Sequence, residues 1–252
     1  MKLYVIPVGQ CDNDKGRVFI PGEENGNRII APNWVGLIQV FGLNILIDTG
    51  MHPNHIELPQ ATFKGTRYET LICPQMKRNE FILNQLSLIS LKSENIDYVV
   101  NTHLHFDHAG CNEYFPKATF IVQKDHYLYA LSMPDEFPKQ YYNLPELNYE
   151  LILGEMSLVP GIDLIRCPGH VPGMMGVVLR FKNSAPIIIA SDAISIKDCI
   201  VQNNWQASWN PILARNSANR LISLTNIENG QLFFGHDPEW WKSVRKFPEY
   251  YD

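Results

Sequence analysis

The segment VVNTHLHFDHAG, residues 99–110, places three histidines and an aspartate within six residues. The whole chain has only 8 histidines in 252 residues, so this clustering is unusual. The apolar residues at its start predict a short buried strand over residues 96–103. Loops that follow strands commonly carry metal-binding and catalytic side chains, because the strand holds the loop in place. The segment therefore predicts a layered fold in which a strand end presents a polar site.

The pattern HxHxDH has the chemistry of a metal site. In an extended segment His103 and His105 point to the same side. As the chain then turns into a helix, the side chains of Asp107 and His108 can reach a position beside them. Imidazole and carboxylate ligands together suit zinc, iron or manganese. A single histidine here would indicate an ordinary loop residue. Chance produces the full pattern in roughly one chain in a few thousand at this composition, which favours metal ligands.

Three further candidate ligands each follow a predicted strand. His170 follows the strand at 162–167, Asp192 ends an apolar strand at 186–192, and His236 lies near the end of a strand at 231–237. Taken alone, Asp192 could cap a helix and His236 could be a loop residue. Together they predict the rest of a metal-binding sphere. The other histidines are interpreted as surface or packing residues: His52, His55 and His126.

Composition narrows the class of protein and partner. The net charge is −5 and no long basic run occurs, which argues against a nucleic-acid partner and favours a small-molecule substrate. No apolar stretch approaches the roughly 20 residues of a membrane-spanning helix. The 5 cysteines are scattered without a CxxC pair, and the N-terminal residues resemble a first strand more than a signal peptide. These features predict a cytoplasmic protein that does not bind membranes.

The order of elements predicts an α/β sandwich in a single domain spanning residues 1–252. Strands dominate the first half, strands and helices alternate afterwards, and no linker separates the two parts. Residues 52–78 and 132–150 are expected to be irregular connections. Further strands are expected at 3–8, 34–41, 43–50, 118–123 and 175–181, with a hairpin turn at FGLN. Helices are expected at 79–92, 107–115, 124–131, from Pro211 with Asn210 as its N-cap, and from Pro238.

These motifs resemble those of the metallo-β-lactamase superfamily: HxHxDH, a later GH followed by PG, a strand-ending aspartate, a final GH, and LIDTG at residues 46–50. The resemblance covers about residues 43 to 237. It implies a four-layer αββα sandwich that holds two zinc ions at one edge of the paired sheets, with iron, manganese or cobalt as alternatives.

The resemblance also implies a role for each ligand. His103, His105 and His170 would bind one metal, and Asp107, His108 and His236 the other. Asp192 would bridge the two metals, and a bridging hydroxide would be the nucleophile. Asp107 would carry a proton to the leaving group, so Asp107 and Asp192 are the catalytic candidates, and Asp48 would brace the site.

Within the superfamily, THLHFDHAGCNEYFP and DTGM resemble the N-acyl-homoserine lactone lactonases, the quorum-quenching branch. Phe106 matches a phenylalanine of that branch and, with Ser195, is a candidate for contact with substrate. The lactonases have a tyrosine at the position of Ser195, where it helps to hold the substrate carbonyl. Because serine is shorter, either another tyrosine replaces it here or the substrate differs. A homodimer is left open.

The leading hypothesis is a dinuclear metal-dependent hydrolase that opens a lactone ring, of an N-acyl-homoserine lactone or a related compound. The nearest alternative is the same chemistry on a thioester or a phosphodiester. An iron-dependent dioxygenase is less favoured, because Asp107, His108 and His236 complete a second metal site. A binding protein without catalysis would be expected to have lost a ligand, and every ligand position is filled.

Overall fold

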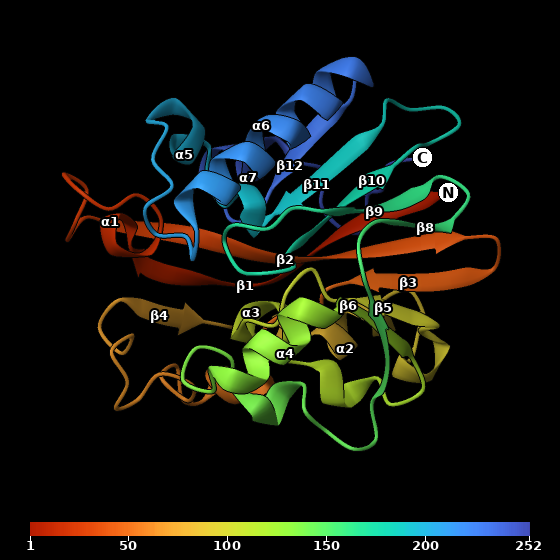
Figure 1. Cartoon of the computed structure of the whole chain (residues 1–252). Helices are drawn as coiled ribbons and strands as arrows, with labels where there is room; N and C mark the ends of the chain where they lie inside the picture. The colour runs from red at the N-terminus through yellow and green to blue at the C-terminus, as the bar shows by residue number, and fades with distance from the viewer.

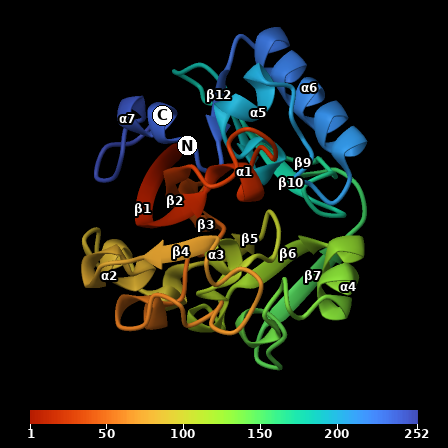
Figure 2. The ribbon, with the colours of Figure 1, turned by 90° about the vertical axis from the view of Figure 1, so that its left-hand side faces the viewer.

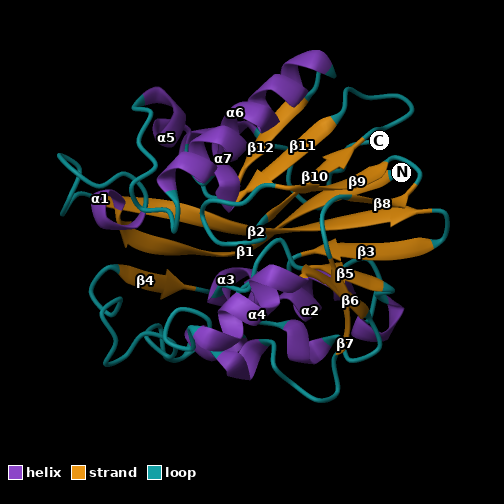
Figure 3. Cartoon of the chain, in the orientation of Figure 1, coloured by secondary structure: helices purple, strands orange, loops and turns teal.

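A seven-stranded mixed sheet forms one half of the molecule (Figures 1 and 3). The structure is a computed structural model that describes residues 1–252. In the order β4-β1-β2-β3-β5-β6-β7, the first four strands pair antiparallel, and β3, β5, β6 and β7 run parallel. The strands are β1 (Lys2–Asp14), β2 (Arg28–Val40), β3 (Leu43–Ile47), β4 (Ile72–Gln75), β5 (Tyr98–Val100), β6 (Thr119–Gln123) and β7 (Asn148–Ile152).

A second sheet of five strands packs against the first, in the order β12-β11-β10-β9-β8. Its strands pair antiparallel except β11 and β12, which run parallel. The strands are β8 (Met156–Val159), β9 (Ile162–Arg166), β10 (Met175–Leu179), β11 (Ile187–Ser191) and β12 (Gln231–Phe234).

Helices cover the outer faces of the two sheets. Figure 2 shows α2 and α4 on the side of the seven-stranded sheet and α5 and α6 on the opposite side. None of the helices combines the length and apolarity needed to cross a membrane. The α-helices are α1 (Lys15–Val18), α2 (Ile82–Ser87), α3 (Phe106–Ala109), α4 (Lys124–Ser132), α5 (Lys197–Val201), α6 (Pro211–Ile227) and α7 (Pro238–Ser243). Short 3₁₀ turns are η1 (Pro53–Ile56), η2 (Arg78–Glu80), η3 (Ser93–Asn95), η4 (Asn112–Tyr114), η5 (Lys139–Tyr141) and η6 (Asp192–Ile194).

Apolar side chains from both sheets form the central core. Val5 and Ile38 of one sheet and Val177 and Ile189 of the other belong to one buried cluster. Burial of each such side chain contributes about 1.5–3 kcal/mol to folding. A second cluster lies between the five-stranded sheet and α6, and a third lies under α2. The predicted four-layer αββα sandwich is therefore confirmed.

Several local predictions are also confirmed. The turn between β2 and β3 places Phe41 and Gly42 at positive φ, as a two-residue hairpin requires. Helix α6 begins at Pro211, and the side chain of Asn210 accepts a hydrogen bond from the backbone N–H of Leu213 at 3.1 Å. The buried positions Ala214, Ser217, Ala218 and Leu221 follow the helical period and pack towards the sheet.

Some predictions of local structure were wrong. The segment 132–150, expected to be irregular, ends in the first residues of β7. The helix expected at 79–92 is confined mainly to α2, because Ser90 adopts a left-handed conformation and the Leu91 N–H bonds back to the carbonyl of Leu86. The segment 52–78 contains β4, which pairs with the end of β1. The expected helix at 107–115 is split into α3 and η4.

Candidate metal centre

The predicted ligands meet at one edge of the two sheets. Each follows a strand, and that strand fixes the backbone from which the side chain projects. His103 and His105 follow β5, and Asp107 and His108 lie in the short helix α3 that comes next. Residues from the other sheet approach from the opposite side, after strands β9, β11 and β12 respectively: His170, Asp192 and His236.

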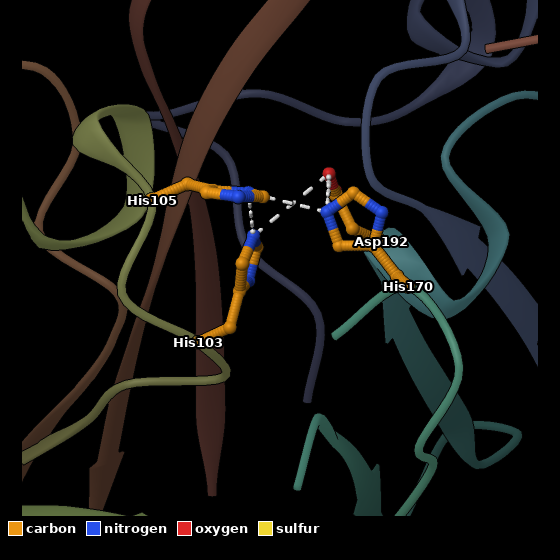
Figure 4. Close-up of side chains that lie close together, drawn as sticks. All are labelled: His103, His105, His170 and Asp192. Atoms are coloured by element: carbon orange, nitrogen blue, oxygen red, sulfur yellow. Dashed lines mark hydrogen bonds and ion pairs between the residues drawn. The ribbon is translucent and has the colours of Figure 1, made fainter. Parts of the chain in front are cut away.

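The first group of ligand atoms comprises His103, His105, His170 and Asp192, all within 4.8 Å of one another. Figure 4 shows their polar atoms converging on one point. Nδ1 of His105 lies 2.8 Å from Nε2 of His103 and 3.2 Å from Nε2 of His170. Tetrahedral ligands of zinc are roughly 3.4 Å apart. Three imidazole nitrogens and a carboxylate oxygen at this spacing therefore fit a metal ion.

The second group comprises Asp107, His108 and His236. Nε2 of His108 lies 3.4 Å from Nε2 of His236, and Oδ2 of Asp107 lies 3.8 Å and 3.7 Å from these two nitrogens. This group has one carboxylate and two imidazoles, a donor set that also suits zinc or another transition metal.

Asp192 faces both groups with different oxygens. Its Oδ2 lies 3.4 Å from Nε2 of His170, and its Oδ1 lies 3.0 Å from Nε2 of His236 and 3.6 Å from Nε2 of His108. Oδ1 is buried and makes no hydrogen bond of acceptable geometry. A buried carboxylate oxygen without such a bond is costly unless a cation neutralises it. The residues therefore fit two metal ions with Asp192 between them.

The protonation states differ between the two groups. Burial lowers the pKa of His103, His105 and His170, and the neighbouring imidazoles add to the effect for His103 and His105. These rings are neutral at pH 7 and offer lone pairs. For His108, burial acts in the same direction, but the nearby carboxylates outweigh it and raise its pKa to about 10. The carboxylates responsible are those of Asp107, Asp48 and Asp192.

Outer contacts orient the imidazole rings. Nδ1 of His108 donates to Oδ2 of Asp48 at 2.8 Å, and the same carboxylate accepts from the N–H and the hydroxyl of Thr102, each at 2.8 Å. Nδ1 of His236 donates to the carbonyl of Pro32 at 3.0 Å. Both histidines therefore present Nε2 to the site. The bracing contact expected of Asp48 is present.

Unusual backbone conformations bring the ligands close. Asp48 and Gly50 both have positive φ, at 63° and 81°. Ser191, which precedes Asp192, has φ 47°, and its hydroxyl lies 2.9 Å from that of Thr102. A Cβ at Gly235 would lie 2.5 Å from Oδ1 of Asp192, so only glycine lets the end of β12 approach this carboxylate.

A cavity of about 490 Å³ opens onto both ligand groups. Phe106 lines it and packs edge-on against Phe63, with ring centroids 4.6 Å apart. Trp209 lines the cavity, whereas Trp205 is buried in the core. Ser195 is not among the lining residues; its backbone carbonyl accepts the N–H of His236 at 2.7 Å. The assignment of Ser195 to substrate remains a prediction.

Sequence reasoning missed two contributors to the site. Nε2 of the fully buried His126 accepts a hydrogen bond from the backbone N–H of Leu104 at 2.8 Å and so holds the loop between His103 and His105. Asn13, at the end of β1, lines the cavity. A lone histidine in a helix and a lone asparagine in a strand carry no distinguishing pattern, so neither could have been found from the sequence.

Comparison with known proteins places these features in a family. The family model of the metallo-β-lactamase superfamily, which describes its sequences, matches residues 31–244 of this chain. An N-acyl homoserine lactonase of Bacillus thuringiensis is 36% identical over 252 residues, which cover 99% of this chain and 98% of the relative.

Solved structures agree with this result. A structure of an N-acyl homoserine lactone hydrolase, with the product N-hexanoyl-L-homoserine bound at its catalytic metal centre, has a TM-score of 0.92 and 36% identity, covering 99% of this chain and 98% of that one. A dizinc quorum-quenching lactonase shares the fold, with a TM-score of 0.69, 16% identity, and coverage of 98% and 92%. The chain belongs to the metallo-β-lactamase superfamily and is a metal-dependent hydrolase similar to the N-acyl homoserine lactonases.

Proposed function

We propose that the protein hydrolyses the lactone ring of N-acyl homoserine lactones or closely related lactones, using two metal ions. The observation that carries this proposal is the position of Asp192, whose two oxygens face two separate ligand groups beside one cavity. The relatives with full-length similarity are N-acyl homoserine lactonases, which supports this substrate class.

We assign the candidate ligands to the two ions as the resemblance to the superfamily implies. His103, His105 and His170 would hold one ion, Asp107, His108 and His236 the other, and Asp192 would contact both. When bound, the two ions would supply a shared hydroxide as nucleophile and would polarise the lactone carbonyl. Zinc suits these donors, and iron, manganese and cobalt are alternatives.

Other side chains would supply proton transfer, the orientation of a metal ligand and an apolar wall for the acyl chain. Asp107 lines the cavity, so its carboxylate is placed to accept the proton released as the nucleophile adds to the carbonyl and to pass that proton to the alkoxide that leaves when the ring opens. Asp48 fixes the orientation of His108. Phe63 and Phe106 offer an apolar wall to the acyl chain and exclude water from the reacting bond.

The proposal is tested by acid release from a panel of purified lactones. The panel contains N-acyl homoserine lactones of short and long acyl chain, simple γ-lactones, a thioester and a phosphodiester. We expect metal-dependent acid release from the acyl homoserine lactones, lost after chelation and restored by zinc. Hydrolysis of the thioester or the phosphodiester without lactone opening would contradict the proposal.

A further inference from the structure

Asn13 is a polar side chain of the cavity that has no role in the proposed reaction. Asn13 is only 5% exposed, and its Oδ1 is buried without a hydrogen-bond partner. The same residue lines the cavity that opens onto the metal-binding groups. Buried polar atoms nearly always have a partner, so an unpartnered amide beside a ligand cavity indicates a bound group.

The fold holds Asn13 firmly in place. Side chains alternate along β1, so Asn13 lies on the same face as Cys11, which also lines the cavity. The backbone of Asn13 is paired with Ile29 of β2 on one side and Ile72 of β4 on the other. The next residue, Asp14, caps helix α1. The backbone that carries the amide is therefore part of a rigid wall.

Most other charged or hydrogen-bonding side chains in the cavity, outside the metal-binding groups, are already engaged. Arg17 pairs with Asp14 at 2.7 Å. At the rim, one set of side chains bonds within itself: Arg67, Tyr68 and Glu136. The nearby walls are apolar and include Phe19, Phe63 and Phe106. Asn13 is thus a buried amide in a largely apolar chamber.

We propose that Asn13 binds a hydroxyl group carried on the acyl chain of the substrate, and this inference rests on the proposed lactonase function. Oδ1 is closed to the cavity in this conformation, and a turn of the amide about its Cβ–Cγ bond brings it to the cavity. A hydroxyl can then donate to Oδ1 or accept from Nδ2, whereas a keto oxygen can only accept. An unsubstituted chain would leave the amide unpaired when the acyl group excludes water. Asn13 therefore selects hydroxylated over unsubstituted and keto-substituted acyl chains.

The test compares acyl homoserine lactones of equal chain length. The chains are unsubstituted, carry a hydroxyl at the third carbon, carry a keto group there, or carry a hydroxyl at the chain end. We expect kcat/KM for one of the hydroxylated substrates to exceed that of the unsubstituted one by about tenfold in the natural protein. In Asn13→Leu, which removes the amide and keeps the branched shape of the side chain, this ratio should fall to near one.

Asn33→Leu is the matched control. Asn33 lies on the neighbouring strand and also has a buried Oδ1 without a partner, but it does not line the cavity. This variant should keep the preference for a hydroxyl. Loss of the preference in both variants would overturn the inference. The same preference in the natural protein and in Asn13→Leu would also overturn it. In either case, continued hydrolysis of the lactones would leave the proposed function standing. A natural protein without any preference overturns it irrespective of how the variants fold.

Calorimetry separates the inference from the proposed function. The probes are the ring-opened N-acyl homoserines with and without the hydroxyl, titrated into the metal-loaded protein. Tighter binding of a hydroxylated probe to the natural protein than to Asn13→Leu supports the inference even if no lactone is hydrolysed. Equal binding of the hydroxylated and unsubstituted probes overturns it.

Discussion

Oδ2 of Asp48 accepts a hydrogen bond from Nδ1 of His108 at 2.8 Å, and this bond turns Nε2 of His108 towards Asp107 and His236. The two residues are 60 positions apart in sequence: Asp48 follows β3, and His108 lies in helix α3. Asp48 also accepts two bonds from Thr102, just before His103. One buried carboxylate therefore ties the loop after β3 to the loop that carries the first ligands.

Asp48→Asn should weaken metal binding without disturbing the backbone. Asparagine tolerates the positive φ at this position, but its amide is a poorer acceptor and can present a donor to His108. We expect metal affinity at the group containing His108 to fall by about 10–100-fold. Metal titration against a competing chelator measures this. Asp163→Asn is the control, because Asp163 lies near the start of β9 and belongs neither to the ligand groups nor to the cavity lining. Unchanged affinity in Asp48→Asn would show that the contact does not orient the ligand.

Asp192→Asn should lower turnover by orders of magnitude with little loss of fold. The substitution keeps the size of the side chain but removes the charge that faces both ligand groups. Metal content per chain and kcat are measured on the same preparation, and circular dichroism checks the fold. Full activity in this variant would refute the bridging role.

Gly235→Ala should damage the site through a single methyl group. The added Cβ would lie 2.5 Å from Oδ1 of Asp192, so the carboxylate or the end of β12 must move. We expect fewer bound metals per chain and lower kcat. Gly36→Ala is the control, because a Cβ at Gly36 meets its nearest neighbours at 3.4 Å. If both variants retain the natural metal content, close approach at Gly235 is not needed.

The affinities of the two ligand groups for metal should depend differently on pH. In the metal-free protein the pKa of His108 is raised to about 10, so a proton must leave before this ring can bind a metal. Burial opposes protonation of His236, but the carboxylate of Asp192 outweighs it and raises the pKa of this ring as well. Affinity at this group should therefore rise with pH by at least about tenfold per unit below pH 10. His103 and His105 have lowered pKa values and are already neutral at pH 7, so affinity there should change little. Chelator-competition titrations at pH 6.5, 7.5 and 8.5 measure the affinity for each of the two metal ions. An equal change of both affinities with pH would contradict the assigned protonation states.

The grouping of the candidate ligands could be predicted from the sequence because each residue belongs to a local pattern. His103 to His108 form a compact motif, and His170, Asp192 and His236 each follow an apolar strand. Strand ends meet at the sheet edge in this fold, so their grouping followed from topology. The bracing role of Asp48 came from resemblance, and only the structure shows the hydrogen bond.

Other features depend on tertiary contacts that no local pattern records. Strand β7 is largely exposed at a sheet edge, so it lacks the apolar alternation that marks a strand. Helix α2 ends early because the left-handed conformation of Ser90 reverses the chain. The position of Asn13 against the cavity depends on the pairing of β1 with β4. Strand β4 lies in the segment 52–78, whose apolar residues show no clear periodicity.

The most direct test of the account is turnover measured while metal is returned stepwise to the stripped protein. An acyl homoserine lactone is the substrate, and bound zinc is measured at each step. If Asp192 links two ions in one catalytic centre, activity should stay low until the first equivalent is bound and rise as the second one binds. Full activity with one equivalent of zinc bound per chain would contradict a dinuclear centre. No activity with two equivalents bound would contradict the proposed lactone hydrolysis.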